Sequence, residues 1–361
     1  MQGYDLQEVV GCFGIMGEDK ATIMPYGNGH INDTYLVQTG SAKYILQRIN
    51  HNVFKKPEQV MANIVLVTEH LQKKIIEKGG NPVRETLKFL KTVDGQDYYK
   101  TENGNYFRMY IYVDDVSTYQ MAEKPEHLYN AARTFGRFQN DLADFPADTL
   151  GETIPNFHNT KARFENLRLA IQEDVKGRKN EVGSEIQFAL QREKELGVIV
   201  DAIEAGEIPL RVTHNDTKIN NILFDHQTDE GICVIDLDTV MPGSVLYDFG
   251  ESIRTGASTA LEDETNLDKV ECSLALFEAF TQGFLEELGS GMTEKEIALL
   301  PFAVKLMTYE NGIRFLTDYL SGDVYFKIHR PKHNLDRCRM QFKLVEDIES
   351  KMERMKEIVR R

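Results

Sequence analysis

The chain has 361 residues, of which 41% are hydrophobic and 27% charged, and its formal net charge is −15. This is the composition of an ordinary globular protein that is too long for one small domain. The negative charge argues against a nucleic-acid partner, whose phosphates would be repelled, and no apolar stretch approaches the roughly 18 residues of a membrane span.

The chain start and the cysteines point to a cytoplasmic protein. The opening residues MQGYDLQEVV have neither a basic leader nor an apolar core, which predicts that no signal peptide is present. The four cysteines form no CxxC pair, so a zinc site or a disulfide framework is not expected. They are Cys12, Cys233, Cys272 and Cys338.

Short strands alternate with turns through the first hundred or so residues. Three segments carry β-branched or aromatic residues at every second position, which predicts strands at 22–27, 31–37 and 42–49. A helix is predicted over residues 57–78, because apolar residues recur every three or four positions behind Pro57.

A hairpin and a further strand complete this part of the chain. Asp94-Gly95 is a strong turn signal between LKFLKTV and QDYYKT, which predicts a hairpin. The segment NYFRMYIYV predicts another strand. Residues 1–113 are therefore expected to form a small lobe with about five strands and one helix, followed by a hinge near 113–118.

The rest of the chain, residues 114–361, is predicted to be a large helical lobe. Apolar side chains at helical spacing predict helices at 125–142, 182–205, 268–289, 293–320 and 334–360. Between them, RVTHNDTKINN (211–221) is followed by two short predicted strands, 222–224 and 232–236. The predicted fold class is thus α+β, with a small β-rich N-lobe and a large helical C-lobe.

The stretch RVTHNDTKINN places polar residues behind an apolar run. If it is a loop, Asp216 can point into a cleft, and a hairpin of the next two strands would bring Asp236 beside Asn221. Such a set offers one carboxylate to accept a proton and an Asn–Asp pair for a divalent cation, as phosphoryl transfer requires. The alternative is a turn and hairpin with exposed polar residues. The doublet Asn220-Asn221 leaves open which Asn is the ligand.

The glycine turn Gly27-Asn28-Gly29 is weak evidence by itself, because G-x-G between strands is usually only a turn. Glycine does, however, let backbone N–H groups approach phosphates closely. The order is glycine turn, strand, a strand with Gln47 and Arg48, helix, hinge and then H-x-D-x₄-N. That is the order of parts in a protein kinase.

Here the sequence resembles a known family. HNDTKINN and IDLDTVMPGSVLYDFG are similar to the motifs of the aminoglycoside phosphotransferase and choline kinase group, which has the two-lobed protein-kinase-like fold. The resemblance is closer still to bacterial N-acetylhexosamine 1-kinases. It extends along nearly the whole chain and includes PYGNGHIN, YILQRIN, GASTALEDE and IRFLTDYLSGDVYF.

The resemblance implies an activity. It is the transfer of the ATP γ-phosphate, with Mg²⁺, to the anomeric hydroxyl of GlcNAc or GalNAc, which gives the sugar 1-phosphate. Asp216 would be the catalytic base, and Asn221 and Asp236 would hold Mg²⁺. The sequence does not rank GlcNAc against GalNAc.

The resemblance also implies binding residues. The phosphates of ATP would be covered by Gly27, Asn28, Gly29 and Asn32. Arg48 would supply the cation that a lysine supplies in other kinases, because Arg grips phosphate in a fork. Whether Gln47 or Arg48 faces the phosphates, and whether Glu69 pairs with that cation, stays open. Besides Asp216, the expected sugar contacts are His30, Asp238, Thr239, Arg254, Arg314 and Tyr325.

Three alternatives compete with the sugar 1-kinase. A kinase of the same fold could act on another hexose, a choline-like amino alcohol or an aminoglycoside; the full-length resemblance disfavours this. A silent binding protein would require the loss of Asp216, Asn221 or Asp236, all of which are present. A serine/threonine protein kinase would carry a lysine strand and an APE-type segment, which this chain lacks, and the DFG of such a kinase appears here as Asp236-Leu237-Asp238. YDFG at 247–250 is not that segment, because it follows Asp236 by twelve residues.

Overall fold

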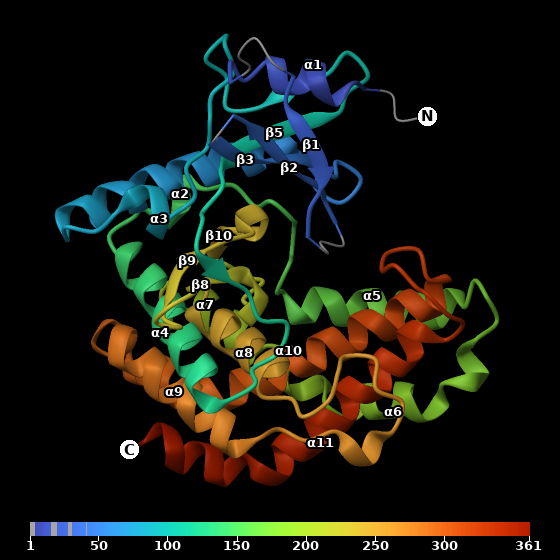
Figure 1. Cartoon of the computed structure of the whole chain (residues 1–361). Helices are drawn as coiled ribbons and strands as arrows, with labels where there is room; N and C mark the ends of the chain where they lie inside the picture. The colour runs from blue at the N-terminus through green and yellow to red at the C-terminus, as the bar shows by residue number, and fades with distance from the viewer. Residues whose placement is uncertain (1–3, 16–19, 28–30, 41) are drawn as a thin grey trace.

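The structure is a computed structural model that describes residues 4–15, 20–27, 31–40 and 42–361. A small part built on an antiparallel sheet lies above a large helical part (Figure 1). The five strands of the sheet run in the order β1-β2-β3-β5-β4. Their bounds are Thr22–Pro25 (β1), Asp33–Thr39 (β2), Ala42–Ile49 (β3), Tyr99–Lys100 (β4) and Tyr106–Ile111 (β5). The predicted α+β class, with a small β-rich and a large helical lobe, is confirmed.

Helices cover both faces of this sheet. α1 (Leu6–Gly11) packs against one face, to which Leu46 of β3 contributes. α2 (Pro57–Glu77) packs against the other face, to which Ile49 of β3 contributes. Successive side chains of a strand point to opposite faces. Gln47 therefore shares the α2 face with Ile49, whereas the intervening residue of β3 belongs to the α1 face.

The predicted hairpin around Asp94-Gly95 is only partly formed. The turn is present, because Thr92 N donates to Gln96 O over 2.8 Å and Gly95 has a φ of 78°. Residues 87–93, all of which the structure describes, form no strand and make a single bridge from Phe89 to Tyr110 of β5. The outer edge of β5 pairs instead with β4, so β4 is the fifth strand of the sheet.

The helical part contains two smaller sheets. One pairs β6 (Val116–Ser117), β8 (Ile222–Asp225) and β9 (Gly231–Val234), and the other pairs β7 (Arg211–Thr213) with β10 (Met241–Gly243). Its helices are α4 (Pro125–Asp141), α5 (Thr160–Glu173), α6 (Gly183–Gln191), α7 (Val198–Glu204), α8 (Val245–Gly256), α9 (Leu274–Leu288), α10 (Glu294–Ser321) and α11 (His333–Val359), whereas α3 (Pro82–Glu85) follows α2.

The predicted helices differ from the structure in several places. α5 was not predicted, and the helix expected over 268–289 begins at Leu274. The helix expected over 182–205 is divided into α6 and α7, with the 3-10 turn Glu193–Glu195 and Gly197 between them. α8 was not predicted either, although Val245, Phe249 and Ile253 recur at helical spacing, because sequence reasoning considered this segment only as a possible metal motif. α10 lies within one residue of the predicted 293–320 at each end, and it has a capping box at Thr293 and Glu296 and Gly322 at its C-terminus.

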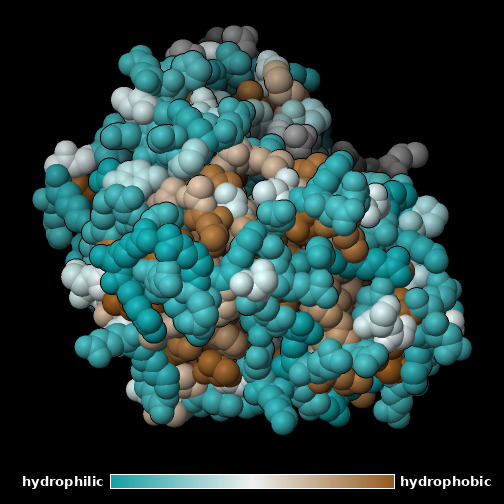
Figure 2. Space-filling view, turned by 90° about the horizontal axis from the view of Figure 1, so that it is seen from below, coloured by the Kyte–Doolittle hydropathy of each residue, from teal (hydrophilic) through white to brown (hydrophobic). Residues whose placement is uncertain are grey.

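One hydrophobic core joins the two parts. Buried side chains of α2 and Ile49 belong to the same cluster as those of α4, α8 and α9. The surface seen from below is mostly hydrophilic, with smaller hydrophobic areas between the hydrophilic residues (Figure 2). Among the residues that the structure describes, no helix is both long and apolar enough to cross a membrane.

Candidate active site

Asp248 of α8 holds the loop that follows β7. Its carboxylate accepts hydrogen bonds from the backbone N–H groups of His214 (3.0 Å) and Asn215 (2.7 Å) and from the side chain of Gln139. Burial raises the pKa of Asp248, and these three donors act against that effect. Asn215 lies in the left-handed region with a φ of 65°. Asp248 thus fixes a strained loop. Sequence reasoning missed this role because it asked only whether YDFG was a metal motif.

His214 and Thr239 tie this loop to the segment after β9. Nε2 of His214 donates to Ile235 O (2.9 Å), and Nδ1 accepts from the backbone N of Asp216 (3.3 Å). The hydroxyl of Thr239, a predicted sugar contact, donates to His214 O over 2.7 Å. The buried Thr239 side chain is therefore used within the protein, and the structure does not bring its hydroxyl to a ligand position.

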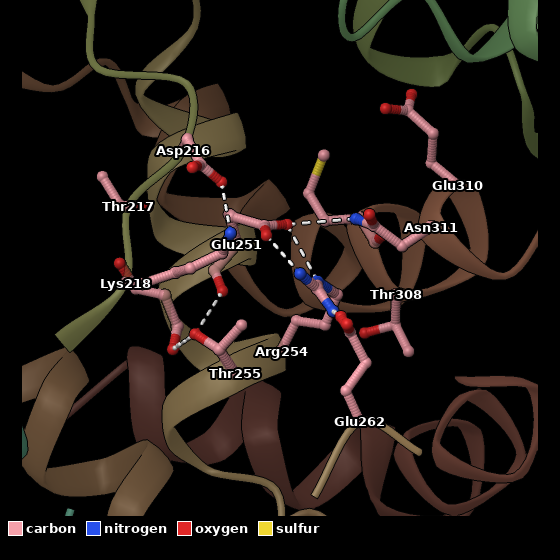
Figure 3. A network of polar contacts seen from close by, with 12 residues as sticks. Asp216, Thr217, Lys218, Glu251, Arg254, Thr255, Glu262, Thr308, Glu310 and Asn311 are labelled. Atoms are coloured by element: carbon pink, nitrogen blue, oxygen red, sulfur yellow. Dashed lines mark hydrogen bonds and ion pairs between the residues drawn. The ribbon is translucent and has the colours of Figure 1, made fainter. Parts of the chain in front are cut away.

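The carboxylate of Asp216 is 27% exposed and lies 2.8 Å from Nζ of Lys218. Burial acts to raise the pKa of Asp216, but the charge and hydrogen bond of Lys218 outweigh it and hold the pKa below its ordinary value. Figure 3 shows Asp216 and Lys218 facing each other beside Glu251. Asp216 is thus ionised and reachable, which is what a proton acceptor requires. Sequence reasoning missed Lys218.

The predicted hairpin of β8 and β9 is confirmed. The strands pair antiparallel, and Ile235 N donates to Asn221 O over 2.9 Å. Asp236, the next residue, adopts a left-handed conformation with a φ of 60°. The two ends of the hairpin therefore place Asn221 and Asp236 together, next to the loop that carries Asp216.

The chemistry of this pair fits a divalent cation. The side-chain nitrogen of Asn221 donates to Asp216 O (2.9 Å), so the amide oxygen is the atom left for a ligand. Asn220 instead donates to Gln120 at 3.5 Å. Burial and the charges of Asp238 and Asp216 raise the pKa of Asp236 to about 6, and within the described ranges its carboxylate has no hydrogen bond or ion pair. A carboxylate that is repelled by its neighbours, has no cationic partner and lies beside an amide oxygen provides the oxygen ligands that Mg²⁺ prefers.

The cationic side chain that extends from the sheet toward the helical part is that of Arg108 on β5. This buried guanidinium pairs with Asp238 and donates to Gln47 Oε1 over 3.0 and 2.8 Å. Asp238 also accepts from the side-chain nitrogen of Asn32 at 2.5 Å. Asp238, a predicted sugar contact, thus joins the helical part to the sheet. Sequence reasoning missed Arg108, although a lone Arg in the apolar strand NYFRMYIYV was a visible signal.

Arg48 faces the other way. It pairs with Asp33 on the neighbouring strand, with Nε 2.7 Å and Nη2 2.6 Å from the carboxylate. Because side chains alternate along β3, Gln47 rather than Arg48 faces Asp238. The structure therefore does not bring Arg48 to the loop of Asp216. Glu69 is exposed on α2, and the α2 residue that reaches across is Asn63, which donates to Val240 O over 2.8 Å.

Replacing Arg108 by Gln is expected to lower the free energy of unfolding by about 3 kcal/mol, because it leaves the Asp238 carboxylate buried without its partner. The matched control is Arg48→Gln, whose partly exposed pair with Asp33 is expected to contribute no more than about 1 kcal/mol. Urea denaturation of both variants measures the difference. Equal losses would show that the Arg108 pair does not join the two parts of the chain.

A second cluster lies on the other side of Asp216. Arg254 of α8 is buried and pairs with Glu251 and with Glu262, the latter at 2.9 Å. Asn311 of α10 donates to Glu251 over 3.1 Å. These side chains converge beside Asp216 (Figure 3). Both carboxylates of the cluster pair with the same guanidinium, which compensates one of their two negative charges.

Arg314 and Tyr325, two predicted sugar contacts, line a pocket of about 340 Å³ between α5, α10 and residues 324–326. Nη1 of Arg314 lies 3.4 Å from Asn311 Oδ1, which connects the pocket to the cluster beside Asp216. Tyr325 is 53% exposed. The predicted phosphate-binding residues Asn28 and Gly29 and the predicted sugar contact His30 lie outside the described residues. Gly27 has a φ of 72°, where glycine is favoured.

Comparison with known proteins gives a family match and similar folds. Residues 22–272 match the phosphotransferase enzyme family (APH). An aminoglycoside phosphotransferase from Alicyclobacillus acidocaldarius has a similar structure, with a TM-score of 0.60, 15% identity, and coverage of 100% of this chain and 98% of that one. A choline kinase from Cryptosporidium parvum has a TM-score of 0.58, 14% identity, and 97% coverage of each chain.

A third solved structure carries ligands. A spectinomycin phosphotransferase in complex with ADP and spectinomycin has a TM-score of 0.56, 12% identity, and coverage of 98% of this chain and 99% of that one. At these identities the likeness concerns the fold. It confirms the prediction of a two-lobed kinase-like fold.

Proposed function

This chain belongs to the phosphotransferase enzyme family, and on that premise we propose that it transfers the γ-phosphate of ATP to the anomeric hydroxyl of an N-acetylhexosamine, GlcNAc or GalNAc. One observation carries the proposal. The ionised Asp216 shares one loop with Asn221, which the hairpin places beside the unpaired Asp236. A proton acceptor and a metal-binding pair at adjacent positions are the requirements of phosphoryl transfer to an alcohol.

The residues have separate tasks in this proposal. Asp216 orients the acceptor hydroxyl and takes its proton as the new bond to phosphorus forms. Lys218, 2.8 Å from Asp216, keeps that carboxylate ionised before the acceptor arrives. Asn221 and Asp236 would hold Mg²⁺, which when bound neutralises charge on the phosphates. The turn at Gly27 and the residues up to Asn32 would cover the phosphates.

The charge balance beside Asp216 supports a neutral acceptor. An amino alcohol or an aminoglycoside is a cation and needs carboxylates that are free to pair with it. Glu251 and Glu262 both pair with Arg254, and Arg337 lies 4.0 Å from Glu262, so two guanidinium groups face the two carboxylates. The groups that remain are suited to the hydroxyls of a sugar. Arg254 would support this surface, and Arg314 would extend it through Asn311.

A coupled ADP-release assay over an acceptor panel tests the proposal. The panel contains GlcNAc, GalNAc, glucose, galactose, choline and an aminoglycoside. We expect turnover with GlcNAc or GalNAc that is abolished by EDTA, and a phosphorylated product that is sensitive to mild acid as an anomeric phosphate. Turnover with choline or the aminoglycoside alone would replace the proposal with a kinase for cationic acceptors. Turnover that survives EDTA would remove the metal role of Asn221 and Asp236.

A further inference from the structure

Hydrogen bonds hold the backbone on both sides of Asp216. The N–H of Asn215 donates to Asp248, and the N–H of Asp216 donates to Nδ1 of His214 over 3.3 Å. The carbonyl oxygen of Asp216 accepts from the side chain of Asn221. These partners belong to the loop itself, to the turn that follows it or to α8. The remaining group is the carbonyl oxygen of Asn215, which belongs to the peptide that leads into Asp216.

His158, in the segment before α5, binds this carbonyl oxygen. Its Nε2 lies 2.7 Å from Asn215 O, a residue 57 positions later in the chain. The imidazole is buried, and its ring centre lies 4.5 Å from that of Phe157 and 5.1 Å from that of Tyr247. Because a carbonyl oxygen can only accept, Nε2 carries the proton of this bond. His158 therefore donates to the loop from a distant part of the chain.

Glu310 of α10 fixes the imidazole from its other side. Its Oε1 lies 2.9 Å from Nδ1 of His158, and its Oε2 accepts from the hydroxyl of Thr160 over 2.6 Å. Burial acts to raise the pKa of Glu310, but the hydrogen bond and the charge of His158 are the main effects that outweigh it and lower the pKa. The carboxylate is thus ionised and accepts from Nδ1. Both ring nitrogens of His158 then carry a proton, and the two side chains form a buried ion pair.

Such a pair does little for the stability of a fold. Removing two charges from water costs solvation free energy, and apolar side chains of similar volume often give equal or higher stability. What the pair provides is direction, because the carboxylate fixes the ring and the ring aims its second N–H at the loop. The Glu310 carboxylate points away from the cluster around Arg254 (Figure 3). The pair therefore acts on the backbone of the loop, separately from that cluster.

We propose that the His158–Glu310 pair positions the base: the N–H of His158 sets the orientation of the peptide before Asp216, and so the direction in which the Asp216 carboxylate meets the acceptor hydroxyl. His158 is a positioning residue, because it acts through this peptide. The inference rests on the proposed function, in which Asp216 is the base, but it does not depend on which alcohol is the acceptor. A misplacement of about 1 Å at a reacting group lowers turnover by about 10²-fold.

Two neutral variants separate the two bonds of His158. Counted in bonds from Cβ, the amide nitrogen of Gln corresponds to Nε2 of histidine and that of Asn to Nδ1. His158→Gln therefore keeps a donor for Asn215 O and His158→Asn loses it, while both remove the cation beside Glu310. We expect kcat to fall about 10²-fold in His158→Asn and to stay within about tenfold of wild type in His158→Gln. Calorimetric titration with ADP and Mg²⁺ should show unchanged binding in both.

Two results of this comparison would overturn the proposal. Equal kcat values in His158→Asn and His158→Gln would show that the bond to Asn215 O does not matter for turnover. A loss of ADP binding as large as the loss of kcat would show that His158 acts on the nucleotide site.

A double-mutant cycle shows whether His158 acts through Asp216. In Asp216→Asn the base is already lost, so adding His158→Asn should lower kcat by less than about threefold more. Effects that multiply would overturn the proposal, because His158 would then act elsewhere. The cycle uses whichever acceptor the wild type phosphorylates. The expected cycle with choline as the acceptor would remove the sugar proposal and support the positioning role, whereas normal turnover in Asp216→Asn, or no turnover with any acceptor, would overturn both.

His127 supplies a matched control for folding. It is also buried, its Nε2 lies 3.1 Å from Asp229, and its ring stacks on that of Tyr119 at 4.0 Å. Asp229 lies in the turn between β8 and β9, at the end of the hairpin away from the metal-binding pair. His127→Asn should lower the urea midpoint about as much as His158→Asn but keep kcat within about twofold of wild type. An equal loss of kcat in both would indicate a general folding defect and overturn the proposal.

Thr160→Val keeps the test decisive if His158→Asn does not fold. This substitution keeps the size of the side chain and removes one of the hydrogen bonds that fix Glu310. It should lower kcat without changing ADP binding, by a smaller factor than the loss expected for His158→Asn. Wild-type kcat in a folded Thr160→Val would then overturn the proposal.

Discussion

Replacing Asp216 by Asn is expected to lower kcat by about 10³-fold, within the range measured for positioned general bases. The amide has the size of the carboxylate but cannot take the proton of the acceptor hydroxyl. Binding of the nucleotide should be largely retained, because the metal-binding pair is Asn221 and Asp236. Steady-state ADP release measures kcat, and calorimetric titration with ADP in the presence of Mg²⁺ measures the binding.

The control for this prediction is Asp201→Asn. Asp201 is an exposed carboxylate on α7 that pairs with Lys161, away from the loop of Asp216. Its loss should leave kcat within about twofold of wild type, as expected for a surface substitution. Near-normal turnover in Asp216→Asn would remove Asp216 from the role of base. A loss of ADP binding equal to the loss of kcat would assign Asp216 to the nucleotide instead.

The second large effect is expected from the metal-binding pair. Asp236→Ala and Asn221→Ala should each lower kcat/KM for ATP by about 10²-fold or more, because the charge on the transferred phosphate would no longer be neutralised in place. The Mg²⁺ concentration needed for half-maximal rate should rise in both variants. Titration of activity with Mg²⁺ at fixed ATP provides the measurement.

The doublet Asn220-Asn221 supplies a matched control for the metal-binding pair of Asn221 and Asp236. Asn220 is the same residue type as Asn221 and its direct neighbour, but its side chain donates to Gln120 and not to the loop of Asp216. Asn220→Ala should therefore change kcat/KM by no more than about threefold. If Asn220→Ala and Asn221→Ala have equal effects, or if Mg²⁺ dependence is unchanged in Asp236→Ala, the pair is not the metal site.

The sequence was most informative where local pattern and structure coincide. β3 occupies the predicted residues 42–49, and α2 ends one residue short of the predicted 57–78. The hairpin of β8 and β9 follows from two short apolar runs joined by a turn, and it brings Asn221 to the strand that leads into Asp236. These features depend on residues that are close together in the chain, and the periodic pattern of their apolar side chains can be recognised in a single sequence.

Packing between distant segments decided the rest of the site. Arg108 pairs with a residue 130 positions away, and Asp248 of the unpredicted α8 holds the backbone of a loop 33 and 34 positions earlier. Which of Gln47 and Arg48 faces the helical part depended on which helix covers each face of the sheet. No periodicity encodes such pairings, because they depend on where whole elements pack.

The sequence by itself thus determined the two-part organisation, the class of chemistry and the loop that carries the proposed base. Only the tertiary structure decided which cation extends from the sheet toward the helical part, which Asn turns toward the loop, and that His158 binds the peptide before Asp216. The physical reason is the range of the interactions. Strands, helices and turns are specified by residues within a few positions of one another, whereas buried charges find partners through the packing of the whole chain.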